Sequence, residues 1–119
     1  MKNLILILAV LFMYLPSFAQ ENDSVKYEKK GDLTEATYFY ADGTVQQQGT
    51  FNENGKLHGV WTSFDVNGNK LSVGNYDNGK KVGKWFFWTK DFLREVDYSD
   101  SKILSVNKWN DKSQLAISN

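Results

Sequence analysis

Few residues of this chain could take part in catalysis or metal binding. Its 119 residues include a single histidine, His58, and no cysteine. Acid–base catalysis needs a titratable group held against a partner group, and a structural zinc site needs several cysteine and histidine ligands. The run Asp65–Asn69 (DVNGN) offers oxygen ligands for calcium, but it lacks the bidentate acidic residue that closes an EF-hand loop. These patterns predict no catalytic residue, no metal and no cofactor.

The run Gly79–Lys84 (GKKVGK) has a superficial likeness to a phosphate-binding loop. It lacks the spacing of a P-loop, and the residues after it are not patterned as a helix whose N-terminus could hold a phosphate. The charges of the chain are balanced, with 14 basic and 14 acidic residues. Such a balance gives no long-range attraction to nucleic acid, so nucleic acid is not an expected partner.

The same run places lysines beside large aromatic rings, a combination that suits anionic ligands or sugars. Ammonium groups pair with anions, and aromatic faces attract cations. The candidate binding residues are Trp61, Trp85, Phe87, Lys80, Lys81 and Lys84. The ligand would be an anionic lipid headgroup or a glycan. The alternative is that the lysines are solvated strand residues that offset nearby acidic groups.

The run Trp85–Trp88 (WFFW) is apolar at every position. Side chains alternate along a strand, so this run would place aromatic rings on both faces of a sheet. A covering layer on both faces would explain the pattern. A surface for a partner, or for self-association, would explain it as well.

Four turns divide the chain into strand-length segments. Gly43, Gly55, Gly68 and Gly79 each follow Asn or Asp, which is the strongest short-range signal for a hairpin. Between these turns lie runs of seven to ten residues that are rich in Val, Thr and aromatic residues, and helical periodicity is missing. We therefore predict an all-β fold, an antiparallel β-meander with tight turns at these four glycines.

The meander is expected to consist of a repeat of 24 or 25 residues, because the segment FNENGKLHGVW is echoed by YDNGKKVGKW. The matching positions are Gly49 and Gly74, Phe51 and Tyr76, Gly55 and Gly79, Gly59 and Gly83, and Trp61 and Trp85. One repeat comprises two strands and two turns. A fixed period of this size is typical of a solenoid-like stack or an extended meander. Val82 stands at the position equivalent to His58, so the repeat does not require histidine there.

Glycine alternates with an aromatic residue four times in this repeat, at Gly49-x-Phe51, Gly59-x-Trp61, Gly74-x-Tyr76 and Gly83-x-Trp85. Residues two apart in a strand share one face. Glycine normally weakens a strand, so we interpret these glycines as vacating space for a ring of the neighbouring strand. A side chain at Gly59 or Gly83 is then expected to collide with that ring.

This repeated pattern, an aromatic residue followed by Asn-Gly-Lys and then Gly-x-Trp, resembles the MORN-repeat family in its bacterial variant form. The resemblance covers roughly residues 36–98, and Leu93–Trp109 fits a degenerate terminal repeat, because Ser101 and Asn107 stand near the expected glycines. The resemblance implies a β-hairpin repeat that acts as a lipid or protein interaction module. Related chains are also labelled as toxin–antitoxin antitoxin components or as nicotinate mononucleotide adenylyltransferase. The latter class uses an α/β fold and a histidine pair, which this sequence lacks.

Residues 1–19 have the features of a secretory signal peptide. Lys2 precedes the twelve-residue apolar run Leu4–Leu15, and Ser17–Ala19 supplies small residues for a cleavage site before Gln20. Twelve apolar residues are fewer than the roughly 20 that span a bilayer. Export would place the protein poorly to neutralise a cytosolic toxin, which disfavours the antitoxin alternative.

The sequence thus predicts a signal peptide over residues 1–19, a polar N-terminal segment over 20–33, a MORN-like β-repeat domain over 34–109 and a polar C-terminal tail over 110–119. The expected protein is secreted or periplasmic and is not an enzyme. It is expected to bind a protein, glycan or envelope component through the glycine-and-aromatic face of its sheet.

Overall fold

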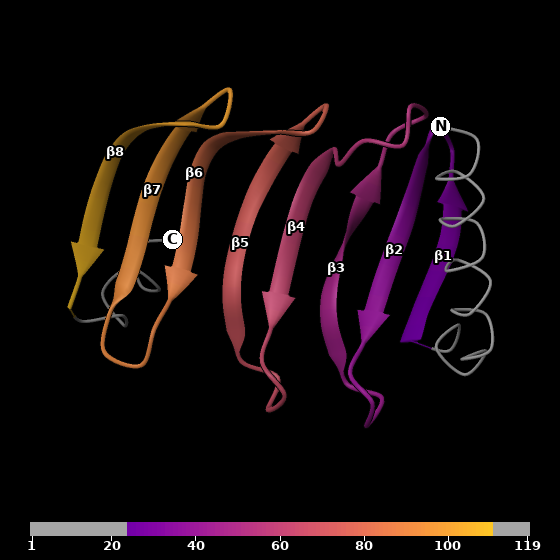
Figure 1. Cartoon of the computed structure of the whole chain (residues 1–119), viewed down its shortest axis with the longest axis horizontal. Coiled ribbons are helices and arrows are strands. Elements are labelled where there is room, and N and C mark those ends of the chain that lie inside the picture. The colour runs from indigo at the N-terminus through magenta and orange to yellow at the C-terminus, as the bar shows by residue number, and fades with distance from the viewer. Residues whose placement is uncertain (1–23, 111–119) are drawn as a thin grey trace, which may run out of the picture.

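The computed structural model describes residues 24–110, which form one open antiparallel sheet of eight strands in chain order (Figure 1). The strands are β1 (Val25–Lys30), β2 (Leu33–Phe39), β3 (Val45–Phe51), β4 (Gly59–Phe64), β5 (Lys70–Asp77), β6 (Lys80–Trp88), β7 (Leu93–Ser99) and β8 (Lys102–Trp109). The predicted all-β antiparallel meander is confirmed, and no α-helix occurs among the described residues. The predicted signal peptide and all but the first residue of the predicted tail lie outside this range.

The predicted glycine turns are all present. Gly43, Gly55, Gly68 and Gly79 lie in turns and have positive φ angles between 75° and 91°, a conformation that glycine adopts without steric cost. The turn between β7 and β8 has no glycine. It uses Asp100 and Ser101 with φ angles of 51° and 67°, because short polar residues tolerate the left-handed region better than larger ones.

The sheet begins earlier than the sequence predicts. Within the expected polar segment 20–33, β1 pairs with β2 along its whole length, from Val25 opposite Tyr38 to Lys30 opposite Leu33. Apolar residues alternate with charged ones only over Val25–Glu28, and five of the six β1 side chains are exposed, so the pattern that identifies a half-buried strand is short and weak here. The backbone ladder to β2 and the turn at Gly31, where φ is 63°, define this strand instead.

The buried apolar side chains are Ala36, Trp61, Trp85, Leu93 and Val96, and the two tryptophan rings lie on glycines of the preceding strand. A Cβ atom built on Gly49 would lie 2.0 Å from Cδ2 of Trp61, and one built on Gly74 would lie 1.9 Å from Cδ2 of Trp85. Trp61 and Trp85 are only 3% and 4% exposed. Gly49 and Gly74 therefore hold open the space that the neighbouring ring fills, as the alternation of glycine and aromatic residues predicts.

Gly59 and Gly83 have a different role, and the predicted ring collision there is wrong. A Cβ atom on Gly83 would have no neighbour within 4 Å, and one on Gly59 would meet only the Thr50 hydroxyl, at 3.0 Å. Both glycines have positive φ angles, 96° and 71°. They lie where the pairing register with the preceding strand changes. Their conformational freedom lets the backbone bulge just before each tryptophan.

Each core tryptophan is also fixed by a hydrogen bond. The indole Nε1–H of Trp61 donates to the carbonyl of Thr50 at 2.9 Å, and that of Trp85 donates to the carbonyl of Asn75 at 3.0 Å. Thr50 and Asn75 are equivalent positions of the repeat. A buried indole N–H requires such an acceptor. The packing of each ring on its glycine and this hydrogen bond together define one orientation for the ring.

Candidate functional site

A row of aromatic rings crosses one face of the sheet from β2 to β7. Trp61 contacts Phe51 and Tyr76, with ring centroids 5.2 and 6.4 Å apart. Trp85 contacts Tyr76 and Tyr98, with centroids 5.0 and 5.9 Å apart. We call this surface the aromatic face; its rings are Tyr38, Phe51, Trp61, Tyr76, Trp85, Phe87 and Tyr98.

The two tryptophans that the sequence suggests as ligand contacts are not available for that role. Trp61 and Trp85 are buried, whereas the other five rings of the aromatic face are half-buried and reach the surface. Phe87 is the one predicted aromatic contact that remains accessible. The tryptophans therefore support the surface rings from beneath and do not themselves stack on a ligand.

The structure does not bring the three candidate lysines together. Lys81 lies on the aromatic face, with its Nζ 5.4 Å from the ring centroid of Trp85 and 5.1 Å from that of Tyr98. Lys84 extends to the opposite face, where its Nζ lies 3.3 Å from Oε2 of Glu95. Lys80 is exposed and adjoins Lys81, so alternation directs it away from the aromatic face. The sequence itself indicates this separation. Lys81 is four residues from Trp85 and so shares its face of the strand, whereas Lys84 is adjacent to Trp85 and so lies on the opposite face.

The run Trp85–Trp88 does place rings on both faces, as predicted. Trp85 stacks with Phe87 at 6.0 Å on the aromatic face, and Phe86 lies 6.3 Å from Trp88 on the other. On that second face Glu95 is nearly buried, and it accepts a hydrogen bond from Trp109 Nε1 at 3.0 Å. With Lys84 as its ion-pair partner, this carboxylate is satisfied by neighbouring groups of the sheet.

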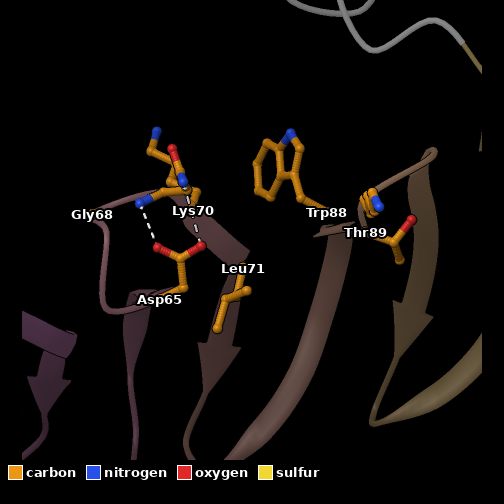
Figure 2. A pocket seen from close by; sticks show the side chains of 8 residues that line it. Asp65, Gly68, Lys70, Leu71, Trp88 and Thr89 are labelled. Atoms are coloured by element: carbon orange, nitrogen blue, oxygen red, sulfur yellow. Dashed lines mark hydrogen bonds between the residues drawn. The ribbon is translucent and has the colours of Figure 1, made fainter.

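A hollow of about 890 Å³ lies between the β4–β5 turn and the end of β6 (Figure 2). It is lined by Asp65, Gly68, Asn69, Lys70, Leu71, Trp88, Thr89 and Lys90. The Asp65 carboxylate accepts hydrogen bonds from the backbone N–H groups of Asn67 and Asn69, both at 2.9 Å. Figure 2 shows this carboxylate turned back toward its own turn. Asp65 therefore stabilises the turn and is not directed at a ligand.

Asp65 is expected to titrate below the ordinary aspartate range. The backbone N–H of Asn69, followed by that of Asn67, lowers its pKa by stabilising the charged form. Because the folded pKa is depressed, the stability from this group is present above the unfolded pKa, about 3.9. That stability is lost as pH falls through the folded pKa. An NMR titration of the carboxyl carbon measures this, with the Asp65→Asn variant as the control for assignment. A pKa at or above the ordinary value would contradict the assigned role.

His58 lies beside a smaller hollow, of about 240 Å³, that also contains Asp32, Leu33, Asn52, Glu53 and Asn54. Its Nδ1 accepts a hydrogen bond from the backbone N–H of Asn78 at 3.1 Å. An accepting Nδ1 carries no proton, so the 3.6 Å approach of Asp77 Oδ1 is not an ion pair in this form. The imidazole thus connects the residue just before β4 to the β5–β6 turn. Among residues 24–110, no group of three or more His, Cys, Asp or Glu side chains is arranged to hold a metal ion.

A third hollow, of about 480 Å³, lies on the aromatic face over β6, β7 and β8. It is lined by Phe87, Arg94, Val96, Tyr98, Ile103, Val106 and Lys108. Its floor is apolar. Its two cationic side chains, Arg94 on β7 and Lys108 on β8, are directly opposite each other in the strand pairing. Sequence reasoning missed this site. The available signal was the alternation Arg94-x-Val96-x-Tyr98 followed by Val106-x-Lys108.

No protein-family model matches the chain, and neither the curated proteins nor the solved structures include a match. Over residues 24–110, the structure contains no helix with the length and hydropathy to cross a membrane. The likeness to MORN repeats therefore rests on the motif itself.

Proposed function

We propose that this protein is an exported, non-enzymatic binding module of MORN-like β-repeats that engages a protein, glycan or other envelope component. The observation that carries this proposal is the single-layer sheet. Domains normally pack two layers around a core, whereas residues 24–110 supply one sheet and no second layer of secondary structure. Five half-buried rings remain at the surface of the aromatic face, and contiguous apolar surface of this kind marks interaction sites.

The buried tryptophans prepare this face for binding. Phe51, Tyr76 and Tyr98 each meet a buried tryptophan edge-on, at interplanar angles of 77° to 89°. Rings held in this way lose little rotational freedom when a partner binds, which lowers the entropic cost of association. Aromatic residues are also enriched in the energetically dominant parts of interfaces.

The side chains that could take part in catalysis, His58 and Asp65, support a binding role and not a catalytic one. His58 and Asp65 both accept hydrogen bonds from turn N–H groups. The Asp77 carboxylate lies 3.6 Å from the same Nδ1 of His58, which is beyond hydrogen-bond distance, so it does not orient the imidazole as the partner of a catalytic base would. Export is supported by the leader-like composition of residues 1–19. An exported domain without cysteine must be stabilised by packing, which the tryptophan-on-glycine contacts provide.

Charge reversal at Lys81 tests which face binds. Lys81→Glu places a negative charge above the Trp85 and Tyr98 rings, whereas Lys80→Glu makes the same charge change on the neighbouring residue of the other face. Recovery of envelope components from an extract on the immobilised protein, quantified by mass spectrometry, should fall about tenfold for Lys81→Glu, equivalent to about 1.4 kcal/mol. Lys80→Glu should match the unaltered protein. Identical recovery with all three proteins would refute the aromatic face as the binding surface.

A further inference from the structure

The strand β8 forms one edge of the sheet and pairs only with β7 among the described residues (Figure 1). Its outer backbone N–H and C=O groups therefore have no partner strand within residues 24–110. Such a row of backbone groups is a template on which another extended chain can add as a strand.

The two edge strands of the sheet, β1 and β8, differ in charge and in exposed apolar surface, and this difference makes β8 the edge that is better suited to pair with an added strand. Four of the six residues of β1 are charged, namely Lys26, Glu28, Lys29 and Lys30, and charged side chains discourage strand addition. By contrast, β8 exposes Ile103, Leu104 and Val106, which are 61%, 64% and 52% exposed. An edge with this much accessible apolar surface favours pairing with a further strand.

Two cationic side chains beside β8, Arg94 and Lys108, determine which charge a strand added to this edge should carry. Arg94 and Lys108 are directly opposite each other, and like charges in that relation are unfavourable. Both lie over the ring of Phe92, at 5.4 and 4.5 Å from its centroid. Within the part of the chain that the structure describes, neither forms an ion pair with a carboxylate. They stand at one end of the 480 Å³ apolar groove, so an incoming carboxylate would relieve their repulsion.

We propose that β8 is the docking edge for an extended segment of a partner protein with an acidic residue beside Lys108 and apolar residues beside Val106 and Ile103. This rests on the proposed binding function and deepens it by naming the partner's chemistry. Backbone hydrogen bonds to β8 provide affinity, and the side chains that face the groove provide specificity. Alternate residues of a strand share one face, so the acidic residue and the first apolar residue stand two positions apart.

A second copy of this chain fits the edge poorly. Its own edges are β1, with three lysines and one glutamate, and β8, with two lysines and no acidic residue. Either edge would bring lysines toward the cations Arg94 and Lys108, and like charges on neighbouring strands oppose pairing. Charge complementarity therefore selects a different, acidic protein as the occupant.

A pair of synthetic peptides tests this inference. The probe is Thr-Glu-Thr-Val-Thr-Val-Thr, and its matched control has lysine in place of glutamate. Each is titrated to millimolar concentration into the isotope-labelled protein, as purified from expressing cells, while backbone amide signals are followed by NMR. The probe should shift the signals of residues 102–109 saturably and bind about tenfold more tightly than the control. The Lys108→Glu variant should abolish that preference, whereas Lys102→Glu, the same charge change at the other end of β8, should retain it.

Three results would overturn the inference. The first is the absence of shifts in β8, and the second is equal binding of both peptides. The third is a β8 edge already occupied in the free protein, seen as protection of its outer amides from exchange or as signals that depend on protein concentration. That result would identify the chain's own C-terminal residues or a second copy as the occupant. Loss of envelope binding in Lys81→Glu alongside an unresponsive β8 would leave the proposed function standing without this edge.

Discussion

Replacing Gly74 with alanine is expected to lower the free energy of unfolding by about 3 kcal/mol, the upper part of the range for overpacked cores. The added Cβ atom would lie 1.9 Å from Cδ2 of Trp85, far inside van der Waals contact. The ring cannot retreat without cost, because it is 4% exposed and its Nε1–H is hydrogen-bonded to the Asn75 carbonyl. Urea unfolding of the variant followed by tryptophan fluorescence or circular dichroism measures the loss.

Two controls separate the ring clash from a general intolerance of alanine. Gly83→Ala introduces a Cβ atom with no neighbour within 4 Å but at a φ of 71°, so it should cost only the roughly 1–2 kcal/mol of left-handed strain. In a Trp85→Ala background, Gly74→Ala should cost much less than in the native chain, because the colliding ring is gone. Equal costs of Gly74→Ala in both backgrounds would mean that Trp85 does not occupy the space above this glycine.

Replacing Trp85 with alanine is expected to destabilise the protein even more than Gly74→Ala does. The free energy of unfolding should fall by about 3–5 kcal/mol in total, as for other large buried aromatic residues. The indole contacts Tyr76, Phe87 and Tyr98 and covers Gly74, so its removal leaves a cavity and frees three neighbouring rings. It also leaves the Asn75 carbonyl without the indole as donor. Because a domain is stable by only about 5–15 kcal/mol, this change removes a large part of the total.

Trp88→Ala is the matched comparison, since Trp88 lies three residues away on the opposite face and is only half-buried. Its loss should cost about half as much, in proportion to the apolar area withdrawn from water. Chemical unfolding of both variants gives the comparison. A Trp88→Ala variant that is as destabilised as Trp85→Ala would show that the second face contributes as much to stability as the aromatic face.

Both predictions follow from how a one-layer sheet obtains a core. Without a second layer of secondary structure in residues 24–110, apolar rings have only the sheet itself to pack against. Gly49 on β3 and Gly74 on β5 have no side chain, and the tryptophan ring of the following strand occupies the space above each glycine. Each repeat thus depends on its neighbour for burial, which is the general character of repeat proteins.

The sequence alone determined the strand order and most of the turns. Asn-Gly and Asp-Gly pairs have local conformational preferences that do not depend on the rest of the molecule, so the turns at Gly43, Gly55, Gly68 and Gly79 could be placed correctly. The period of 24 or 25 residues then required a regular meander. The strand β1 was not predicted because four of its six residues are charged and five of its six side chains are exposed, which leaves only a short alternation at Val25 and Tyr27.

The tertiary structure alone decided which glycines seat the rings and which groups share a surface. Gly49 and Gly59 occupy similar Gly-x-aromatic patterns, yet one lies under Trp61 and the other permits a bulge. The difference depends on the pairing register between strands, which is set by backbone hydrogen bonds across the sheet and not by local sequence. For the same reason the sequence could list Arg94 and Lys108 but could not place them side by side. Their proximity arises only when β7 and β8 pair in register.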